Sequence, residues 1–407
     1  MPPVLPRVRD SCAALLATPG CPVALGAPAA LAAFLAGPYP ALAAHAAGKG
    51  AGVDLPLALD QDEAIDACVL LCLLQFGSGF RVPLHAALHC GASDAMVRGL
   101  LGFLMVGRKP SAGLLAHLRE HEAAEIWGLP LTVDEVVPHL PCVTMSKPGP
   151  LKPLAAHLAR ALNRCGRVLL EAQAPTFAAY LRAQAPAWCV AEGGRPCIDA
   201  FVAFVAERFP VAFRDVAVYG GGGGGAGAAA AEAGAAPAAA AAGAAPASSA
   251  SPAGGEASAD SGSGGGSGGG AGGAAPPQEV WLLKKAQLLA KELGRKFGGA
   301  LPGLFGWAPP AAAALTAFAD NVLPCVLAAE GVLVVGQALA ARIAAGEAVS
   351  RDEATALRAG AVVACEALAA ASGSTTAEAL DHVLWHAGKL EAYRKLPRHV
   401  DTATCFY

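Results

Sequence analysis

One segment of restricted composition divides this sequence into two parts. From residue 220 to about residue 277 the chain is almost wholly Gly, Ala, Ser and Pro, with no aromatic and almost no large aliphatic residue. Such a segment cannot bury enough apolar surface to offset the entropy lost on ordering, so we expect it to be disordered. Residues 213–219 and 279–283, on either side, resemble ordered strands. We therefore expect a hairpin or tight connection, expanded by an insertion within one domain made of residues 1–219 and 278–407.

The rest of the sequence shows mainly helical periodicity. The acidic residues 60–63 open an apolar run, at the end where the helix dipole favours negative charge. Residues 153–172 and 284–297 repeat apolar side chains at helical spacing. Ser350 begins a capping-box pattern, and an Ala-rich helix over residues 354–371 follows. Because strand patterns are limited to the flanks of the insertion, the sequence predicts a mainly α-helical fold.

Charge and hydropathy limit the class of partner. The net charge is -3, which disfavours binding to a nucleic-acid backbone because such binding needs clustered Lys and Arg. A mononucleotide needs only one or two basic groups, so a small ligand is favoured. No apolar run reaches the ~18 residues of a membrane span, and the N-terminus lacks the pattern of a secretory signal. We expect a cytoplasmic protein without a membrane partner.

The Cys and His residues do not have the spacing of a metal site. The 12 cysteines contain no CxxC and no zinc-finger arrangement, so we expect buried, reduced thiols. His117 and His121 would share a face of one helix, but the HExxH order is absent and an exposed charged helix is favoured. Neither a metal nor an organic cofactor is predicted.

An acid among apolar residues is the first candidate for catalysis. Residues 315–324 place Asp320 in an apolar stretch, four residues before Pro324. Burial would raise the pKa of such a carboxyl group, whereas neighbouring donors would lower it. The same pattern fits an Asp320 that caps a helix running on from Asn321. On the residues alone, the helix cap is the favoured interpretation.

A Gly-rich segment at residues 75–81 is the second candidate. Glycines on both sides of Ser78 permit close approach of the backbone to a ligand, and Phe76 and Phe80 could stack on a base. The segment has neither the phosphate-loop pattern nor the nucleophile-elbow spacing. A helix C-cap with both phenylalanines in the core also explains the pattern and is favoured on the pattern alone.

Two further helices carry candidate groups. Lys284, at the start of the stretch after the insertion, could reach a phosphate as a point charge, although it and Lys285 also fit a solvated face. Asp381 and Trp385 lie four residues apart, which places an acid and an indole on one face of a helix.

Several strings, taken in order, resemble the queuosine salvage (queuosine 5'-phosphate N-glycosylase) family over almost the whole chain. They are VRDSC at 8–12, LQFGSGFR at 74–81, KPGPLKPL at 147–154 leading to GRVLLE at 166–171, FPVAFRD at 209–215, KKAQLL at 284–289, LTAFADNVLP at 315–324 and LDHVLW at 380–385 with the C-terminal FY. The string at 209–215 has one residue more than the family motif. Leu283 and Asn321 stand where many members have tyrosine.

The resemblance implies an all-α fold related to helix-hairpin-helix DNA glycosylases. It also implies hydrolysis of the N-glycosidic bond of queuosine 5'-monophosphate, which releases queuine for reuse in tRNA modification. Asp320 matches the family's catalytic aspartate, which moves our preference from helix cap to catalyst. The substrate-binding residues that we predict are Phe76, Phe80 and Trp385 for stacking on the base, Asp381 for the base or the cyclopentenediol, Lys284 and Arg81 for the phosphate, and Ser78 and Asn321 for further contacts.

Two other functions stay open on the sequence. One is a non-catalytic helical module that binds a modified nucleoside or nucleotide, with Asp320 serving only as a cap. The other is a DNA or RNA glycosylase, against which the acidic balance and the lack of a basic stripe both count. Catalytic turnover of a small nucleotide separates the predicted enzyme from both.

Overall fold

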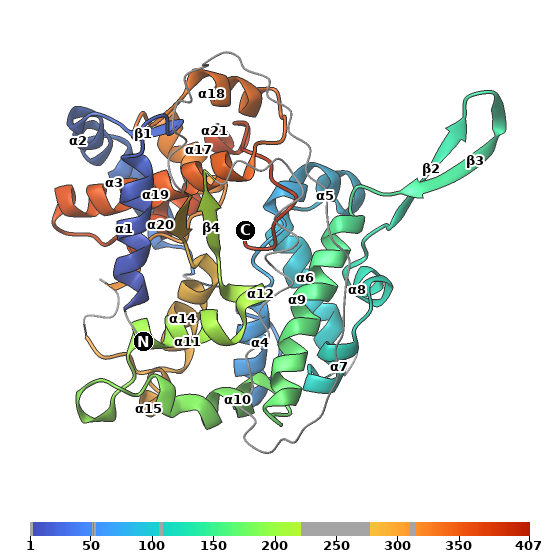
Figure 1. The fold of residues 1–407 in the computed structure, drawn as a ribbon, viewed down its shortest axis with the longest axis horizontal. Coiled ribbons are helices and arrows are strands. Elements are labelled where there is room, and N and C mark those ends of the chain that lie inside the picture. The colour runs from blue at the N-terminus through green and yellow to red at the C-terminus, as the bar shows by residue number, and fades with distance from the viewer. Residues whose placement is uncertain (1–2, 51, 53, 106–108, 221–276, 310–313) are drawn as a thin grey trace, which may run out of the picture. The chain divides into compact units, whose positions relative to one another are not determined.

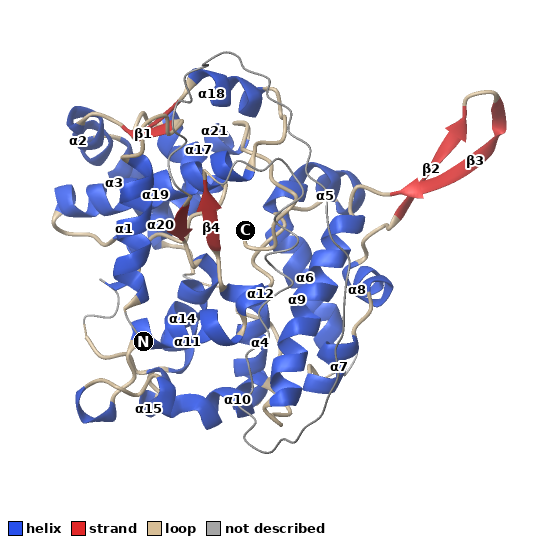
Figure 2. Cartoon of the chain, in the orientation of Figure 1, coloured by secondary structure: helices blue, strands red, loops and turns tan. Residues whose placement is uncertain are grey.

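The computed structural model describes residues 3–50, 52, 54–105, 109–220, 277–309 and 314–407, which are mainly helical (Figures 1 and 2). Described residues of Met1–Tyr219 and Gln278–Tyr407 form one compact unit. The mainly α-helical prediction is thereby confirmed. The segment expected to be disordered, 220–277, lies outside the described residues except at its two ends, and the relation to helix-hairpin-helix glycosylases stays a prediction.

Most of the helices are short and precede the insertion. They are α1 (Val4–Leu16), α2 (Pro28–Ala36), α3 (Pro38–Ala47), α4 (Gln61–Leu73), α5 (Arg81–Leu88), α6 (Ala92–Met105), α7 (Ala112–His117), α8 (Glu120–Trp127), α9 (Lys152–Glu171), α10 (Phe177–Gln184), α11 (Ile198–Arg208) and α12 (Pro210–Phe213). Those after it are α14 (Lys284–Phe297), α15 (Pro302–Phe305), α17 (Val322–Ala329), α18 (Gln337–Ala344), α19 (Arg351–Ser372), α20 (Ala377–Ala387) and α21 (Glu391–Arg394). The described residues also contain the 3-10 turns η1 (Ser78–Phe80), η2 (Ala185–Ala187) and η3 (Glu192–Gly194).

The helices expected from periodicity and capping are present. Asp60 accepts a hydrogen bond from the backbone N of Glu63 at 2.8 Å, and the Glu63 carboxylate accepts from the Asp60 N, which completes a capping box at α4. Ser350 and Glu353 form the same arrangement at α19. Each box satisfies donors that a helix N-terminus leaves without partners.

Two helices at the centre of the unit position the site. α19 packs against α1, α17 and α20, and α14 packs against α4 and α11. The C-terminal tail contacts both helices, because Arg358 of α19 lies over the Tyr407 ring and Lys285 of α14 donates to the Cys405 carbonyl. The Tyr407 carbonyl also accepts a hydrogen bond from Gly77 N. The C-terminal tail thus joins segments from both sides of the insertion.

The strands confirm one prediction and correct another. β4 (Val216–Tyr219) pairs antiparallel with β5 (Gln278–Trp281), so the insertion does expand a hairpin. The expectation that strands occur only there was wrong. β1 (Val23–Leu25) pairs with β6 (Leu333–Val335), and β2 (Thr132–Val137) pairs with β3 (Leu140–Pro148).

The β2–β3 hairpin was missed because it buries no face. It projects from the helices (Figure 2), and all of its strand residues are exposed except Val137, which is half-buried. A strand with no buried face does not alternate apolar and polar residues, which is the signal that sequence analysis depends on.

Among the residues that the structure describes, one helix, α19, is long and apolar enough to cross a membrane by length and composition. Two bent pairs, α2 with α3 and α4 with the segment Ser78–Leu88, pass the same test if each pair is taken as one span. Two thirds of the most apolar window of α19 is buried inside the protein. Its apolar character is therefore explained by its central place in the core.

The expected charged helix around His117 is interrupted. α7 ends at His117 and α8 begins at Glu120, so His117 and His121 do not share one helix. No three His, Cys, Asp or Glu side chains in the described part of the chain are grouped as metal ligands. All twelve cysteines are free thiols; most are buried or half-buried, and Cys142 on the projecting hairpin is the exposed exception to the expectation.

Candidate active site

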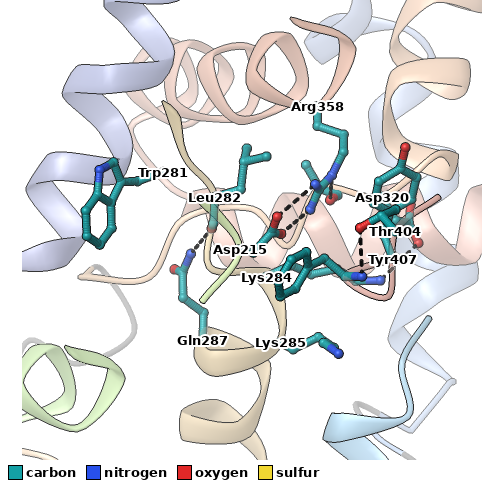
Figure 3. Close-up of polar contacts among 12 residues, drawn as sticks. Asp215, Trp281, Leu282, Lys284, Lys285, Gln287, Asp320, Arg358, Thr404 and Tyr407 are labelled. Atoms are coloured by element: carbon teal, nitrogen blue, oxygen red, sulfur yellow. Dashed lines mark hydrogen bonds and ion pairs between the residues drawn. The ribbon is translucent and has the colours of Figure 1, made fainter. Parts of the chain in front are cut away.

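Asp320 lies buried in the loop before α17, where each of its carboxylate oxygens has a different neighbour. Oδ1 accepts a hydrogen bond from the backbone N of Val322 at 2.7 Å. Oδ2 faces the ammonium of Lys284, with 3.8 Å between Oδ2 and Nζ (Figure 3). The cap interpretation therefore describes one oxygen, while the second faces a buried cation and accepts no backbone hydrogen bond from the described residues. The two interpretations of Asp320 are compatible.

Lys284 is held in place by the start of α14. Its Nζ donates to the carbonyl oxygen of Gln75 at 3.2 Å. Burial lowers its pKa from the usual lysine value, and the charge of Asp320 is the largest opposing effect. The preceding residue, Leu283, has a φ of 51°, a left-handed conformation that a leucine rarely adopts. The turn at Leu283 directs the chain from β5 into α14 and points Lys284 inward.

The prediction that the paired lysines could lie on a solvated face was wrong. Lys285 is fully buried, and its Nζ donates to the carbonyls of Leu73 at 3.0 Å and Cys405 at 2.7 Å. The Nζ also lies 5.0 Å from the centroid of the Phe76 ring. Burial lowers the pKa of Lys285 to about 8. Lys285 thus ties α4 to the C-terminal tail beneath the site.

A buried ion pair beside the site was not predicted. Arg358 of α19 reaches both oxygens of Asp215, with 3.1 Å between Nη1 and Oδ1, and the two side chains are each 4% exposed (Figure 3). Its Nε donates to the carbonyl of Ala319, the residue before Asp320, at 2.9 Å. Its Cζ lies 4.3 Å from the centroid of the Tyr407 ring. Arg358 therefore fixes the backbone that carries Asp320.

Asn321 joins the same loop to the C-terminal tail. Its Nδ2 donates to the carbonyl of His399 at 3.4 Å, whereas its Oδ1 is buried without a hydrogen-bond partner in the described chain. The His399 ring is buried too, and its Nε2 is likewise unpartnered. Burial lowers the pKa of His399 to about 3, so the ring is neutral at physiological pH. Unpartnered buried polar atoms are uncommon in folded proteins, and two of them adjoin Asp320.

Asp381 of α20 is linked to Asp320 through the intervening chain. Its Oδ1 accepts a hydrogen bond from the backbone N of Phe318 at 2.9 Å. Burial raises the pKa of the Asp381 carboxyl to about 7, with Lys291 opposing the rise and the charge of Asp320 adding to it. Trp385 follows one helical turn later, half-buried, with the Lys389 ammonium 3.4 Å from its ring centroid.

The Gly-rich segment packs against the C-terminal tail. Gly77 has a φ of 94°, and its N donates to the Tyr407 carbonyl at 3.0 Å. A Cβ at Gly79 would lie 2.1 Å from the carbonyl oxygen of Asp401, so only glycine fits there. Next to it, the Ser78 Oγ is buried without a partner in the described residues. The two glycines serve close backbone approach, although the backbone they approach is the protein's own tail.

Phe76 and Phe80 belong to the hydrophobic core, at 3% and 2% exposure. Their burial agrees with the interpretation that places both phenylalanines in the core beside a helix C-cap. The stacking of Phe76 and Phe80 on a base stays a prediction. Arg81 begins α5 and is half-buried, with Nη2 donating to the carbonyl of Arg394 at 2.9 Å. The structure thus brings four predicted site residues into one buried cluster: Lys284, Asp320, Asn321 and Asp381. Ser78 lies between the two glycines that contact the C-terminal tail, and Arg81 contacts Arg394 of α21.

The described cavities differ widely in size. A hollow of about 560 Å³ is lined by parts of α7, α8 and α9 and contains none of the predicted site residues. A cavity of about 20 Å³ is lined by residues that include Asp215, Arg358, Asp401 and Tyr407. The second volume accommodates about one water molecule. Small-molecule sites have volumes of ~300 Å³ or more, so a nucleotide would not fit in that cavity.

Sequence reasoning missed several residues of the site, for which weak signals exist. Arg358 is the one basic residue of the Ala-rich run 354–371, and an Arg that is buried in such a run needs a partner for its charge. Asp215 is the last residue of the string at 209–215, which we used only for the family resemblance and not to predict the role of any residue. His399 and Tyr407 lie in the last ten residues of the sequence, which show no periodicity that would indicate which side chains are buried.

The comparisons with known proteins agree with the resemblance for one part of the chain. A family model described as "Queuosine salvage protein" matches residues 275–407, about a third of the sequence. This range includes Lys284, Asp320, Arg358 and Asp381, whereas the Gly-rich segment lies outside it. A search of curated proteins finds no match to the chain.

Proposed function

Residues 275–407 belong to the queuosine salvage protein family, and from this premise we propose that the protein hydrolyses the N-glycosidic bond of queuosine 5'-monophosphate. The family membership itself supports a role in queuosine or queuine salvage, with a queuosine-related small molecule as substrate. In the proposed reaction, water adds to C1' of the ribose and the bond from C1' to the base breaks. The products are queuine and ribose 5-phosphate.

The buried carboxylate of Asp320 is the observation that carries this proposal. Cleavage of a glycosidic bond develops positive charge on the ribose in an oxocarbenium-like transition state. A carboxylate close to C1' stabilises that charge and accepts a proton from the attacking water. The hydrogen bond from Val322 N fixes the Asp320 group before substrate arrives, so little reorganisation is needed during the reaction.

Asp381 is suited to help the base leave. The base is a 7-deazaguanine, which has no ring nitrogen at position 7 to protonate, so departure must be helped at the pyrimidine edge. With a pKa of about 7, the Asp381 carboxyl is partly protonated at neutral pH and can donate a hydrogen bond. A carboxylic acid held protonated in an apolar setting is an established kind of donor in enzymes. We assign Asp381 this role.

Trp385 is the best placed of the predicted aromatic residues to stack on the base. Phe76 and Phe80 are packed in the core, whereas Trp385 is half-buried and lies one turn from Asp381 on α20. An indole face beside a hydrogen-bonding acid matches the two needs of a purine-like base, which are stacking and edge recognition.

The test is a pair of matched Asp→Asn variants assayed for release of queuine by mass. Asp320→Asn should lower the rate by at least about 10²-fold, because it removes the charge that stabilises the transition state. The control is Asp66→Asn, since Asp66 is also buried but accepts its hydrogen bond from Ala178 N and touches none of the site residues. We expect the control to keep the wild-type rate.

Two outcomes would reject the catalytic role. If Asp320→Asn, correctly folded by circular dichroism, turns over at the wild-type rate, Asp320 is only a helix cap. If the wild-type protein binds the nucleotide without releasing base, the protein is a non-catalytic nucleotide-binding module.

A further inference from the structure

A second hollow of the protein lies where α7 and α8 pack against α9 (Figure 1). None of the residues that line it belongs to the cluster around Asp320. Its volume of about 560 Å³ is within the range of ~300–1,000 Å³ that small-molecule sites have. By volume, this hollow can therefore hold a small ligand, whereas the cavity beside Asp215 and Arg358 accommodates about one water molecule.

The walls of the hollow carry an excess of positive charge. The charged or titratable residues that line it are His117, Arg119, Glu120, Arg160, Arg164 and Arg167. Three of the four arginines follow one another on α9 at spacings of four and three residues, which places them on one face of the helix. We expected no basic stripe, and this short one was missed because mostly apolar residues separate its members in the sequence.

Two of these arginines have charges that the protein does not neutralise. Arg119 pairs with Glu122 of α8, with 3.1 Å between Nη2 and Oε1. Arg164 and Arg167, by contrast, occur in none of the ion pairs of the described chain. Both side chains are exposed and line the same hollow. Their guanidinium groups are therefore available to an anionic ligand there.

The wall between the two helices is fixed by close contacts. Asn163 Nδ2 donates to the carbonyls of Leu115 and Leu118, each at 2.8 Å. These carbonyls lie at the end of α7, and their partial negative charge would otherwise repel an anion. A Cβ at Gly166 would lie 2.2 Å from the N of Ala116, so the glycine allows α7 and α9 to touch. A wall that is set before the ligand arrives lowers the cost of binding.

The lining residues indicate which anions fit. Guanidinium groups bind phosphate oxygens through pairs of hydrogen bonds. The arginines of α9 extend over about 10 Å along the helix axis, at 1.5 Å per residue, so they can contact several anionic groups at once. None of the described residues that line the hollow is aromatic, whereas single-stranded nucleic acids are bound largely by stacking of their bases on aromatic side chains. A small ligand with several phosphate groups is therefore favoured over a nucleic acid.

We propose that the hollow between α7, α8 and α9 is a binding site for a small polyphosphate, with Arg164 and Arg167 as its main contacts and Arg119 contributed from the start of α8. The site is separate from Asp320 and does not depend on the proposed function. The chemistry that it recognises is a chain of linked phosphate groups. An inorganic polyphosphate can supply such a chain, and so can a nucleoside triphosphate whose base stays in solvent.

The test is titration calorimetry with inorganic tripolyphosphate on the Arg164→Gln/Arg167→Gln variant. The control is Arg208→Gln, which removes an exposed arginine of α11 that does not line the hollow. The wild type and the control should bind tripolyphosphate with equal affinity, and the double variant at least about 10-fold more weakly, because it loses charged hydrogen bonds. Unchanged affinity in the double variant, or no binding by the wild type, would overturn the proposal.

The substituted side chains are exposed, so the variants should fold as the wild type does, which circular dichroism checks. The single variant Arg167→Gln provides a milder change and should weaken tripolyphosphate binding in the same direction by a smaller factor. A single variant that binds as tightly as the wild type would remove Arg167 from the site and overturn its assigned role.

Two other ligands identify the source of the phosphate chain. If adenosine triphosphate binds with the affinity of tripolyphosphate, the base adds nothing and the phosphate chain alone is recognised. If it binds much more tightly, and the double variant loses this binding too, the natural ligand is a nucleoside triphosphate. A single-stranded RNA that binds more tightly than either, through the same two arginines, would overturn the assignment to a small ligand.

Turnover separates this hollow from the candidate active site. Without polyphosphate, the Arg164→Gln/Arg167→Gln variant should release queuine from queuosine 5'-monophosphate at the wild-type rate. A loss of turnover in the folded variant would place the hollow in the substrate site and overturn the separate site that we propose. If the wild type releases no queuine, the proposed function fails, while the calorimetric comparison still decides whether the polyphosphate site exists.

Discussion

The buried pair of Asp215 and Arg358 should contribute strongly to stability, and its loss can be measured. Both side chains are 4% exposed, and the guanidinium also holds the Ala319 carbonyl. The Asp215→Ala variant leaves the charge of Arg358 buried without its counter-ion. Removing one partner of a buried pair typically costs 3–5 kcal/mol, so we expect the free energy of unfolding to fall by about that amount.

The double variant separates the buried charge from the lost packing. In Asp215→Ala/Arg358→Met, neither charge is buried, so much of the lost stability should return. The remaining loss should be about 1–3 kcal/mol, because the Ala319 carbonyl loses its donor. The assay is urea unfolding followed by circular dichroism, with Asp62→Ala as control. Asp62 pairs with Arg182 on the surface, and breaking that pair should cost less than about 1 kcal/mol.

Two results would refute this reasoning. The first is an Asp215→Ala variant that loses no more stability than the surface control. The second is a double variant that is less stable than the single one, which would mean that packing or the Ala319 contact, and not the uncompensated charge, dominates.

Three further predictions follow from the site and the fold. Since protonated Asp381 assists the leaving base, the rate of queuine release should fall as the pH rises through about 7, and a pH profile of Asp381→Asn should lack this fall. Gly79→Ala should lower both thermal stability and turnover, because its Cβ would lie 2.1 Å from the Asp401 carbonyl oxygen; a wild-type melting temperature would contradict the close approach. Replacing residues 222–275 by a four-residue turn should raise the free energy of unfolding by about 2 kcal/mol, because each halving of the loop length recovers ~0.6 kcal/mol of closure entropy. A lower midpoint in urea unfolding would contradict this and would show that the insertion contributes stabilising contacts.

The parts of the fold that sequence predicts are those set by local signals. α14 begins and ends at the residues expected, Lys284 and Phe297, because its apolar face repeats without interruption. The capping box of α19 rests on Ser350 and Glu353, three positions apart, and the acidic residues 60–63 mark the start of α4. The hairpin that flanks the insertion was also found, since the change of composition marks both of its strands.

The parts of the fold and site that could not be predicted from the sequence depend on contacts between residues far apart in the chain. Asp215 and Arg358 are 143 residues apart, and nothing local pairs them. Lys285 was not expected to be buried, because the carbonyls that it binds come from Leu73 and Cys405 in distant segments. Periodicity reports which face of an element is buried, but it does not report which other element covers that face.

The most direct test of the account is incubation of the purified protein with queuosine 5'-monophosphate, with both products followed by mass. Hydrolysis at the glycosidic bond predicts queuine and ribose 5-phosphate in equal amounts, over many turnovers per protein molecule, and a rate at least about 10²-fold lower from Asp320→Asn. Intact nucleotide after prolonged incubation with folded protein would contradict the proposed hydrolysis, as would equal product from the Asp320→Asn variant.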